Sequence, residues 1–318
     1  MTMISIRNAG RGLRAPLLAT ACALIGLFPG GALAAPGICG NTNRQLLQAC
    51  RLEARDEAGV GSATCLNLSD TQAARACMRA TQEALSEALA ECLDVREARD
   101  EVCQELGPGP YDPVIDPANF VSGIDNPYSP FPPGAFREYE KRTAEGLERV
   151  RVEVLAERRQ ILGVEVTTLR DTVTLDGVLV EDTVDWLAQD VDGNVWYFGE
   201  ISQGFEEGLL ASLDGSFEAG KNGAKPGFWI KAAPQLGEFY RQEWSLGVAE
   251  DVVEVVSLNA TDTNVPFSGS GPVLKTRDFT PLEPGVEEFK CYVPGIGFVL
   301  EVEPETGERL ELVDYGPR

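Results

Sequence analysis

Six cysteines constrain the fold of this chain more than any other feature. They are Cys39, Cys50, Cys65, Cys77, Cys92 and Cys103, and they are arranged symmetrically about one point of the chain. Nested pairs of this kind are what a helical hairpin cross-linked by disulfides requires. The predicted bonds are Cys39–Cys103, Cys50–Cys92 and Cys65–Cys77. Six cysteines allow many connectivities, and a bond between Cys50 and Cys77 is the main alternative.

The residues between these cysteines have helical periodicity. Residues 41–58 contain neither Gly nor Pro and repeat apolar side chains at helical spacing. The run from Gly59 to Ser62 is expected to end this helix. A second helix is predicted from about Thr71 to Leu106, after the N-cap signal of Asp70. Because the core of such a hairpin is thin, each closed loop is expected to stabilise it, by about 2–4 kcal/mol.

The first 34 residues have the composition of a secretory signal peptide. Three arginines precede an apolar run at 17–28, and Ala32-Leu33-Ala34 follows as a cleavage site. The apolar run is too short to span a membrane, so no transmembrane segment is expected in the mature chain, and Cys22 is removed with the leader. Disulfides form in oxidising compartments. We therefore predict a secreted or periplasmic protein.

Charge and composition exclude several classes of function. Without the three leader arginines the chain keeps 24 basic residues against 50 acidic ones, a net charge of −26. Such a chain repels phosphate backbones and anionic lipids, so nucleic acid is not an expected partner. The chain contains no histidine. Catalysis by Ser-His-Asp or Cys-His groups and histidine-ligated zinc are therefore excluded.

The rest of the chain predicts an antiparallel β domain. The Cys-rich hairpin at 35–106 is followed by a proline-rich linker at 107–134, which is expected to pack on the β domain at 135–318. Beyond 135 apolar residues alternate with period two, and Asp-Gly pairs at 176, 192 and 214 indicate hairpins. Later strands are expected near 238–244, 252–258, 273–279, 287–292 and 298–302. About ten to twelve strands with short turns predict an α+β fold with a curled, half-barrel or barrel-like sheet.

Four segments resemble a family of secreted bacterial proteins that has no assigned function. They are NPYSPFPPG at 126–134, WLAQDVDGNVWYFGE at 186–200, GAKPG at 223–227 and TPLEPGVEEFKCYVPGIGFVLE at 280–301. The motif from Tyr292 to Val299 also resembles the closing hairpin of bacterial envelope proteins and lipoproteins with curled antiparallel sheets. These resemblances imply the same two-part fold and bring no catalytic residues with them.

Seven aromatic residues are expected on neighbouring strands of this sheet. They are Trp186, Trp196, Tyr197, Phe198, Trp229, Tyr240 and Trp244. Large aromatic side chains ordinarily fill the core of a sheet. Since successive residues of a strand face opposite sides, the run at 196–198 places rings on both faces. The run therefore indicates a ligand-binding surface or an apolar cavity in the curled sheet.

Asp190, Asp192 and Asn194 place three oxygen-bearing side chains in one turn. Calcium is bound by several such oxygens, which makes this turn a candidate Ca²⁺ site. No other cofactor is expected. The spacing departs from that of an EF-hand loop, because Ile201 stands where a bidentate Glu is required. An ordinary hairpin turn uses the same residues, and we favour that interpretation.

The remaining charged residues allow further alternatives. Six acids are candidates for the facing carboxylate pair of a hydrolase: Glu200, Glu238, Glu243, Glu283, Glu287 and Glu288. Lys225 and Arg241 are either anion contacts or surface charges, and we favour surface charges. Cys291 is the cysteine left unpaired; burial is its favoured role, because no histidine is present to activate its thiol.

These observations favour a non-catalytic binding protein without assigned catalytic residues. The expected partner is an apolar or aromatic ligand, or an envelope protein, bound by the curled sheet. A calcium-dependent structural or adhesive module and a carboxylate-based hydrolase are the alternatives. Ligand binding requires a cavity lined by the named aromatic residues, and a filled sheet interior would argue against it.

Overall fold

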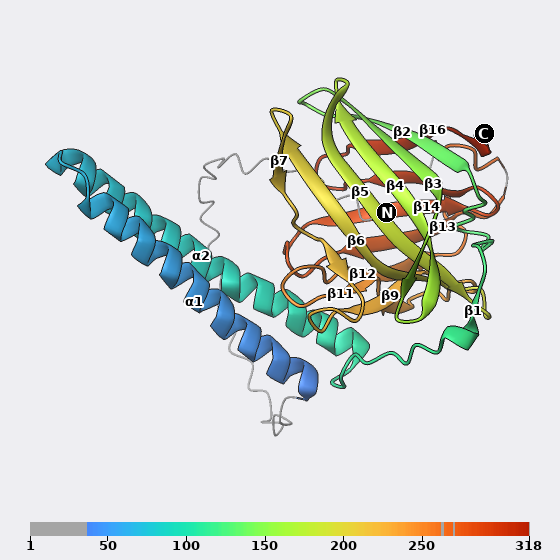
Figure 1. Cartoon of the computed structure of the whole chain (residues 1–318), viewed down its shortest axis with the longest axis horizontal. Coiled ribbons are helices and arrows are strands. Elements are labelled where there is room, and N and C mark those ends of the chain that lie inside the picture. The colour runs from blue at the N-terminus through green and yellow to red at the C-terminus, as the bar shows by residue number, and fades with distance from the viewer. Residues whose placement is uncertain (1–36, 262–263, 270, 318) are drawn as a thin grey trace, which may run out of the picture.

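The computed structural model describes residues 37–261, 264–269 and 271–317. The predicted signal peptide at 1–34 lies outside the described residues. The described chain consists of a two-helix arm and a large β domain, joined by the proline-rich linker (Figure 1). This is the predicted α+β fold. Among the described helices, neither is long and apolar enough to cross a membrane.

The arm consists of α1 (Ile38–Leu66) and α2 (Thr71–Leu106), packed antiparallel. The bounds of α2 match the prediction, and the carboxylate of Asp70 caps it by accepting a 2.6 Å hydrogen bond from the backbone N–H of Ala73. The predicted helix end at Gly59–Ser62 is wrong, since α1 continues to Leu66. Glycine weakens a helix by only about 1 kcal/mol. Here Gly61 lets α2 approach, because a Cβ on it would lie 3.0 Å from Thr81.

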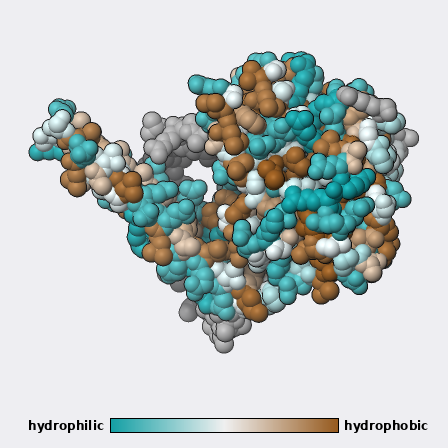
Figure 2. Space-filling view, in the orientation of Figure 1, coloured by the Kyte–Doolittle hydropathy of each residue, from teal (hydrophilic) through white to brown (hydrophobic). Residues whose placement is uncertain are grey.

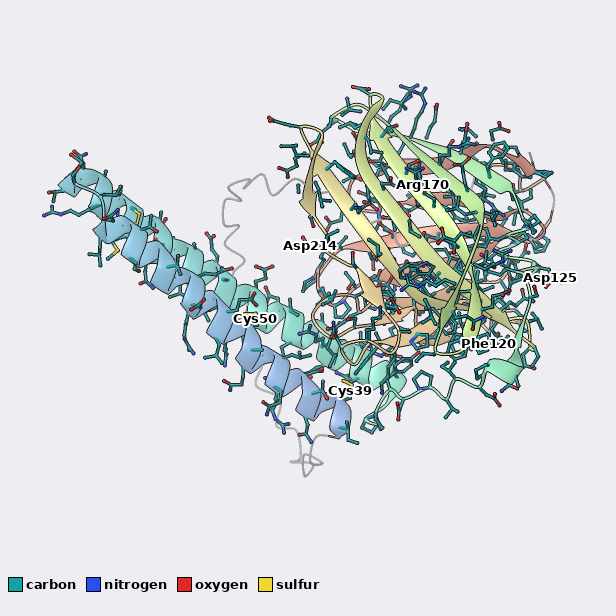
Figure 3. All side chains as sticks on the ribbon, viewed as in Figure 1. Cys39, Cys50, Phe120, Asp125, Arg170 and Asp214 are labelled. Atoms are coloured by element: carbon teal, nitrogen blue, oxygen red, sulfur yellow. A yellow bond between two sulfur atoms is a disulfide. The ribbon has the colours of Figure 1, made fainter. Side chains whose placement is uncertain are left out.

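Three disulfides join the two helices along the arm. They link Cys39 to Cys103, Cys50 to Cys92 and Cys65 to Cys77, with Cα–Cα distances of 5.9, 5.9 and 5.4 Å. This is the nested pairing that the spacing predicts, and the alternative Cys50–Cys77 bond does not occur. The Cys39 end lies at the β domain, and Cys50 lies farther along the arm toward its free tip (Figure 3).

The β domain is one antiparallel sheet that curls into a nearly closed barrel (Figure 1). Its strands are β1 (Phe120–Val121), β2 (Ala135–Arg142), β3 (Leu147–Ile161), β4 (Val164–Leu175), β5 (Val178–Asp190), β6 (Val195–Glu206), β7 (Leu209–Ser212), β8 (Phe217–Glu218), β9 (Lys225–Ile230), β10 (Phe239–Arg241), β11 (Glu243–Trp244), β12 (Val252–Ser257), β13 (Leu274–Phe279), β14 (Glu287–Val293), β15 (Gly297–Val302) and β16 (Arg309–Pro317). The sheet order is β10-β12-β13-β14-β15-β16-β2-β3-β4-β5-β6-β9-β11, with β1, β7 and β8 paired at its side. The described residues thus contain more strands than the sequence predicts, because short strands at the rim were not recognised.

The chain itself connects the two ends of the sheet. β10 and β11 end the sheet order on opposite sides, yet only Gln242 separates them in the sequence. The single strand expected at 238–244 is therefore wrong. The chain passes there from one end of the sheet to the other, and we call the place where these two ends of the sheet meet the barrel seam. Gly227 of β9 makes this crossing possible, since a Cβ on it would lie 2.4 Å from the carbonyl oxygen of Gln242. Arg241 is consequently placed at the seam.

The proline-rich linker runs along the β domain, where it covers part of the sheet (Figures 1 and 3). Phe120 packs against Trp196 and Phe198, with ring centroids 6.2 and 5.5 Å apart. The side-chain oxygen of Gln189 accepts hydrogen bonds from the backbone N–H groups of Asp125 and Asn126, both at 2.9 Å. These contacts explain why a segment with so many prolines is ordered.

The face drawn in Figure 2 mixes polar and apolar residues, and hydrophobic side chains gather in a patch over the β6–β7 hairpin. Leu209 and Leu210 of β7 supply exposed apolar side chains there. The patch lies at the end of the β domain away from β11 (Figure 1), and hence away from the barrel seam.

Candidate ligand-binding cleft

A cleft of about 230 Å³ lies where the base of the helical arm meets the barrel seam. We call it the junction cleft. Both parts of the protein and the linker line it: Ile38, Cys39, Thr42, Asn43, Arg99, Val102 and Leu106 from the arm, Gly107, Gly109, Pro110 and Tyr111 from the linker, and Lys225, Arg241, Trp244, Leu246, Glu250 and Pro281 from the β domain. Most of these side chains are apolar. The cleft exists only while the arm is docked.

A buried ion pair docks the arm to the β domain. Arg99 of α2 donates two hydrogen bonds to the carboxylate of Glu250, from Nε at 2.8 Å and from Nη2 at 2.6 Å. Both side chains are buried, and the backbone N–H of Gly247 donates a further 2.6 Å hydrogen bond to Glu250. A bidentate arginine–carboxylate pair fixes distance and orientation together, so this contact sets the shape of the cleft.

Tyr111 and Trp244 form an aromatic wall of the cleft, with ring centroids 6.1 Å apart. The Tyr111 hydroxyl donates a 2.8 Å hydrogen bond to the carbonyl oxygen of Pro226, which ties the linker to β9. Lys225 lies 5.1 Å from the Trp244 ring centroid. Its ammonium group donates hydrogen bonds to the Tyr111 carbonyl oxygen at 2.7 Å and to Asp112 at 2.6 Å. The charge of Lys225 is therefore already paired.

Arg241 differs from the other cations of the junction cleft because its charge is not paired. Its side chain is 8% exposed, and its guanidinium carbon lies 5.8 Å from the Tyr111 ring centroid. Among the described residues, nothing accepts a hydrogen bond or forms an ion pair with this guanidinium. Burial lowers the pKa of Arg241, while the carboxylate of Glu250 raises it. The interpretation of Arg241 as a surface charge is wrong, because the docked arm and linker cover it.

The seven aromatic residues named from the sequence do not gather in one place. Tyr197, Trp229 and Tyr240 pack in the large core inside the barrel. Trp186, Trp196 and Phe198 lie on the other face of the sheet, as strand alternation requires, and the linker covers part of this face. Only Trp244 lines the junction cleft. The cavity beside Trp229 measures about 20 Å³, so the core around these aromatic residues leaves no room for a ligand.

The turn that holds Asp190, Asp192 and Asn194 is organised by its own hydrogen bonds. The Asp190 carboxylate accepts bonds from the backbone N–H groups of Asp192 at 3.0 Å and Asn194 at 2.9 Å. It also accepts from the Asn194 side-chain amide at 2.9 Å and from the Trp196 indole N–H at 2.8 Å. Four donors occupy both carboxylate oxygens. This geometry is that of a hairpin turn, and the calcium site at this turn stays an untested prediction.

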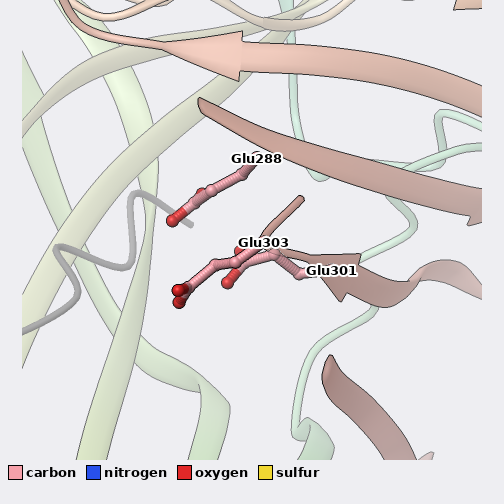
Figure 4. Close-up of side chains that lie close together, drawn as sticks. All are labelled: Glu288, Glu301 and Glu303. Atoms are coloured by element: carbon pink, nitrogen blue, oxygen red, sulfur yellow. The ribbon is translucent and has the colours of Figure 1, made fainter. Parts of the chain in front are cut away.

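Three other carboxylates point toward one another inside the barrel (Figure 4). One oxygen from each of Glu288, Glu301 and Glu303 lies within 4.8 Å of the others, the spacing of a cation site. Two lysines already occupy this region. Lys141 is bonded to Glu303, and Lys290 lies 3.3 Å from Glu288 and 3.9 Å from Glu301. Burial opposes the charge of Lys290, but neighbouring carboxylates raise its pKa well above the ordinary value. The lysines thus supply the positive charge that a metal ion would bring.

Within the part of the chain that the structure describes, no lysine or arginine forms an ion pair with a second group of acids inside the barrel. We call Asp171, Glu181, Asp185 and Glu200 the interior carboxylates; all four are buried. Tyr197 donates its hydroxyl to Asp185 at 2.5 Å and approaches Glu200 at 3.0 Å. Burial raises the pKa of Glu181 to about 7 and raises those of the other three as well. These groups hold their protons at a pH where exposed acids are ionised.

Five of the six acids considered for a hydrolase line one pocket of about 110 Å³, and Glu238 lies outside it. Glu238 is paired with Lys231, Glu287 with Arg277 and Glu288 with Lys290. Glu200 and Glu243 are buried in this pocket, beside Glu283, Glu287 and Glu288. The pocket has about half the volume of the junction cleft. Cys291 is buried in the large core and takes part in none of the three disulfides.

Sequence reasoning missed most of the cleft. Arg99 is one of many charged residues in α2, and Glu250 is one of many acids in the β domain. Nothing in the sequence indicates that they meet across 151 positions. A comparison of the chain with models of known protein families, with curated proteins and with solved structures found no match. The function of this protein is therefore inferred from the chemistry of the junction cleft.

Proposed function

We propose that this is a non-catalytic binding protein that holds a small ligand with a flat apolar body in the junction cleft. The observation that carries the proposal is the cleft itself. It is largely apolar, and Tyr111 and Trp244 form an aromatic wall in it. Its volume is about 230 Å³, compared with about 20 Å³ for the cavity beside Trp229. Apolar clefts with a few placed polar groups are the usual form of small-molecule sites. Three disulfides are typical of an oxidising compartment, and we place this function outside the cytoplasm.

The alternatives have less support from the geometry. A calcium-dependent module would use the turn at Asp190 or the group of Glu288, Glu301 and Glu303, and hydrogen-bond donors or lysines engage both. A hydrolase would use Glu200 and Glu243, in a pocket of about 110 Å³ that has about half the volume of the junction cleft. We therefore favour binding.

A neutral aromatic probe tests this proposal. Phenylacetamide should bind saturably, with a Kd in the millimolar range, since a fragment of this size gains roughly 0.3–0.5 kcal/mol per heavy atom. Isothermal titration calorimetry follows the titration, because its signal does not depend on Trp244, which lines the cleft. Trp244→Ala should weaken binding about tenfold by removing the aromatic wall.

Trp196→Phe is the matched control for this titration. Trp196 packs against Phe120 and Phe228 on another face of the sheet, so the control should bind phenylacetamide as the unaltered protein does. Binding that is insensitive to Trp244→Ala, or no saturable binding at all, would contradict the proposal.

A further inference from the structure

The junction cleft carries a positive charge within a strongly acidic chain. The whole chain has a formal net charge of −23, yet Arg99, Lys225 and Arg241 line the cleft against one carboxylate, that of Glu250. Arg99 takes up Glu250, and Lys225 is paired with Asp112. One positive charge, that of Arg241, is left over.

Leaving this charge unpaired is costly. A buried ion without a partner is strongly disfavoured, and buried charges in proteins are normally paired. Arg241 is 8% exposed, and burial lowers its pKa. The Tyr111 ring lies over it, with its centroid 5.8 Å from the guanidinium carbon. A guanidinium presents several N–H donors in a planar fork that matches a carboxylate in two parallel hydrogen bonds.

We infer that the ligand of the junction cleft is a small organic carboxylate, whose carboxylate binds Arg241 and whose flat apolar body lies against Tyr111 and Trp244. This inference rests on the proposed function and assigns the chemical class of its ligand. A single negative charge fits because only one cation in the cleft is unpaired. An inorganic anion such as phosphate fits less well, because it would leave Val102, Leu106 and Leu246 without an apolar partner.

The position of Arg241 suits this role. It ends β10 at the barrel seam, where its backbone pairs with Val252 of β12 and Gly227 of β9 packs closely against its carbonyl oxygen. The arm, docked through Arg99, closes over it. The backbone is thus held on several sides while the side chain reaches the cleft, which is the preorganisation that a binding site requires.

Calorimetric titration of the unaltered protein with phenylacetate and phenylacetamide tests the inference, since the two probes share a ring and differ in charge. Phenylacetate should bind at least about tenfold more tightly, because a charge-assisted bidentate pair exceeds a neutral hydrogen bond. Its affinity should fall at high salt, while that of the amide should not. Inorganic phosphate at the same concentration should compete weakly.

Arg241→Gln should reduce the affinity for phenylacetate to that of the amide. Arg277→Gln is the matched control, because Arg277 is already paired with Glu254 and Glu287 away from the junction cleft. Equal affinities of acid and amide in the unaltered protein would overturn the inference and leave the proposed function intact. Failure of both probes to bind would overturn the proposed function, and strong competition by phosphate would replace the organic carboxylate by an inorganic anion.

Discussion

The melting temperature of the protein should fall as the pH rises from about 5.5 to about 8.5, by on the order of 10 °C. Burial raises the pKa of Glu181 to about 7 and raises those of Asp185 and Glu200 too. In the unfolded chain these groups ionise near pH 4. Between the unfolded-state pKa near 4 and the folded-state pKa of about 7, the folded protein binds more protons than the unfolded chain. The stability that these carboxyl groups contribute is therefore fully present below about pH 4 and is lost as the pH rises through about 7.

The size of this effect follows from the shift of one group. Each pKa unit corresponds to about 1.4 kcal/mol, so ionising Glu181 within the fold costs on the order of 3 kcal/mol. Glu181→Gln keeps an acceptor for the 2.8 Å hydrogen bond from Thr183 and removes the ionisation. This variant should be more stable than the unaltered protein at about pH 8.5 and no more stable at about pH 5.

The neighbouring Asp182→Asn serves as its control. Asp182 forms a surface ion pair with Arg170, and such pairs contribute at most about 1 kcal/mol. Scanning calorimetry of the three proteins across the pH range provides the measurement. A melting temperature that stays level or rises between pH 5.5 and 8.5 would show that the interior carboxylates are compensated by a charge absent from this account.

Replacing Arg99 by Met should destabilise the protein by about 3–5 kcal/mol and release the arm. The variant leaves Glu250 buried without its partner, and removing one member of a buried pair strands the other charge. Arg96→Met is the matched control, three positions before Arg99 on the same helix. Arg96 pairs with Asp100 at 3.2 Å, and its side chain is 40% exposed, so its loss should cost at most about 1 kcal/mol.

Urea unfolding gives the free energies, and limited proteolysis of the linker at 107–110 reports on arm release. A double variant, Arg99→Met with Glu250→Gln, should recover part of the loss because position 250 no longer carries a buried charge without its partner. Equal costs for Arg99→Met and Arg96→Met would mean that the ion pair does not dock the arm.

Local signals made the arm predictable from the sequence. The cysteine spacing and the cap at Asp70 correspond to the observed disulfides and to the observed start of α2. The error at Gly59 and Gly61 arose because tertiary packing outweighs the weak helix propensity of glycine. Period-two alternation likewise indicated the long strands, since each buries one face.

The candidate site was not predictable, because its chemistry depends on contacts between distant segments. Asp171 and Asp185 follow the alternation that places side chains inside the barrel, yet a pattern based on polarity assigns such residues to the surface. Arg241 is exposed or buried according to whether the arm covers it. The side chains that cover it come from α2 and from the linker, and no local pattern connects these to β10.

The most direct test of the account is a crystal structure of the protein with phenylacetate bound. We expect the ring beside Trp244 and both carboxylate oxygens within hydrogen-bond distance of the Arg241 guanidinium, with Arg99 still paired to Glu250. A ligand bound elsewhere, or a carboxylate directed to solvent while Arg241 turns to Glu250, would contradict it.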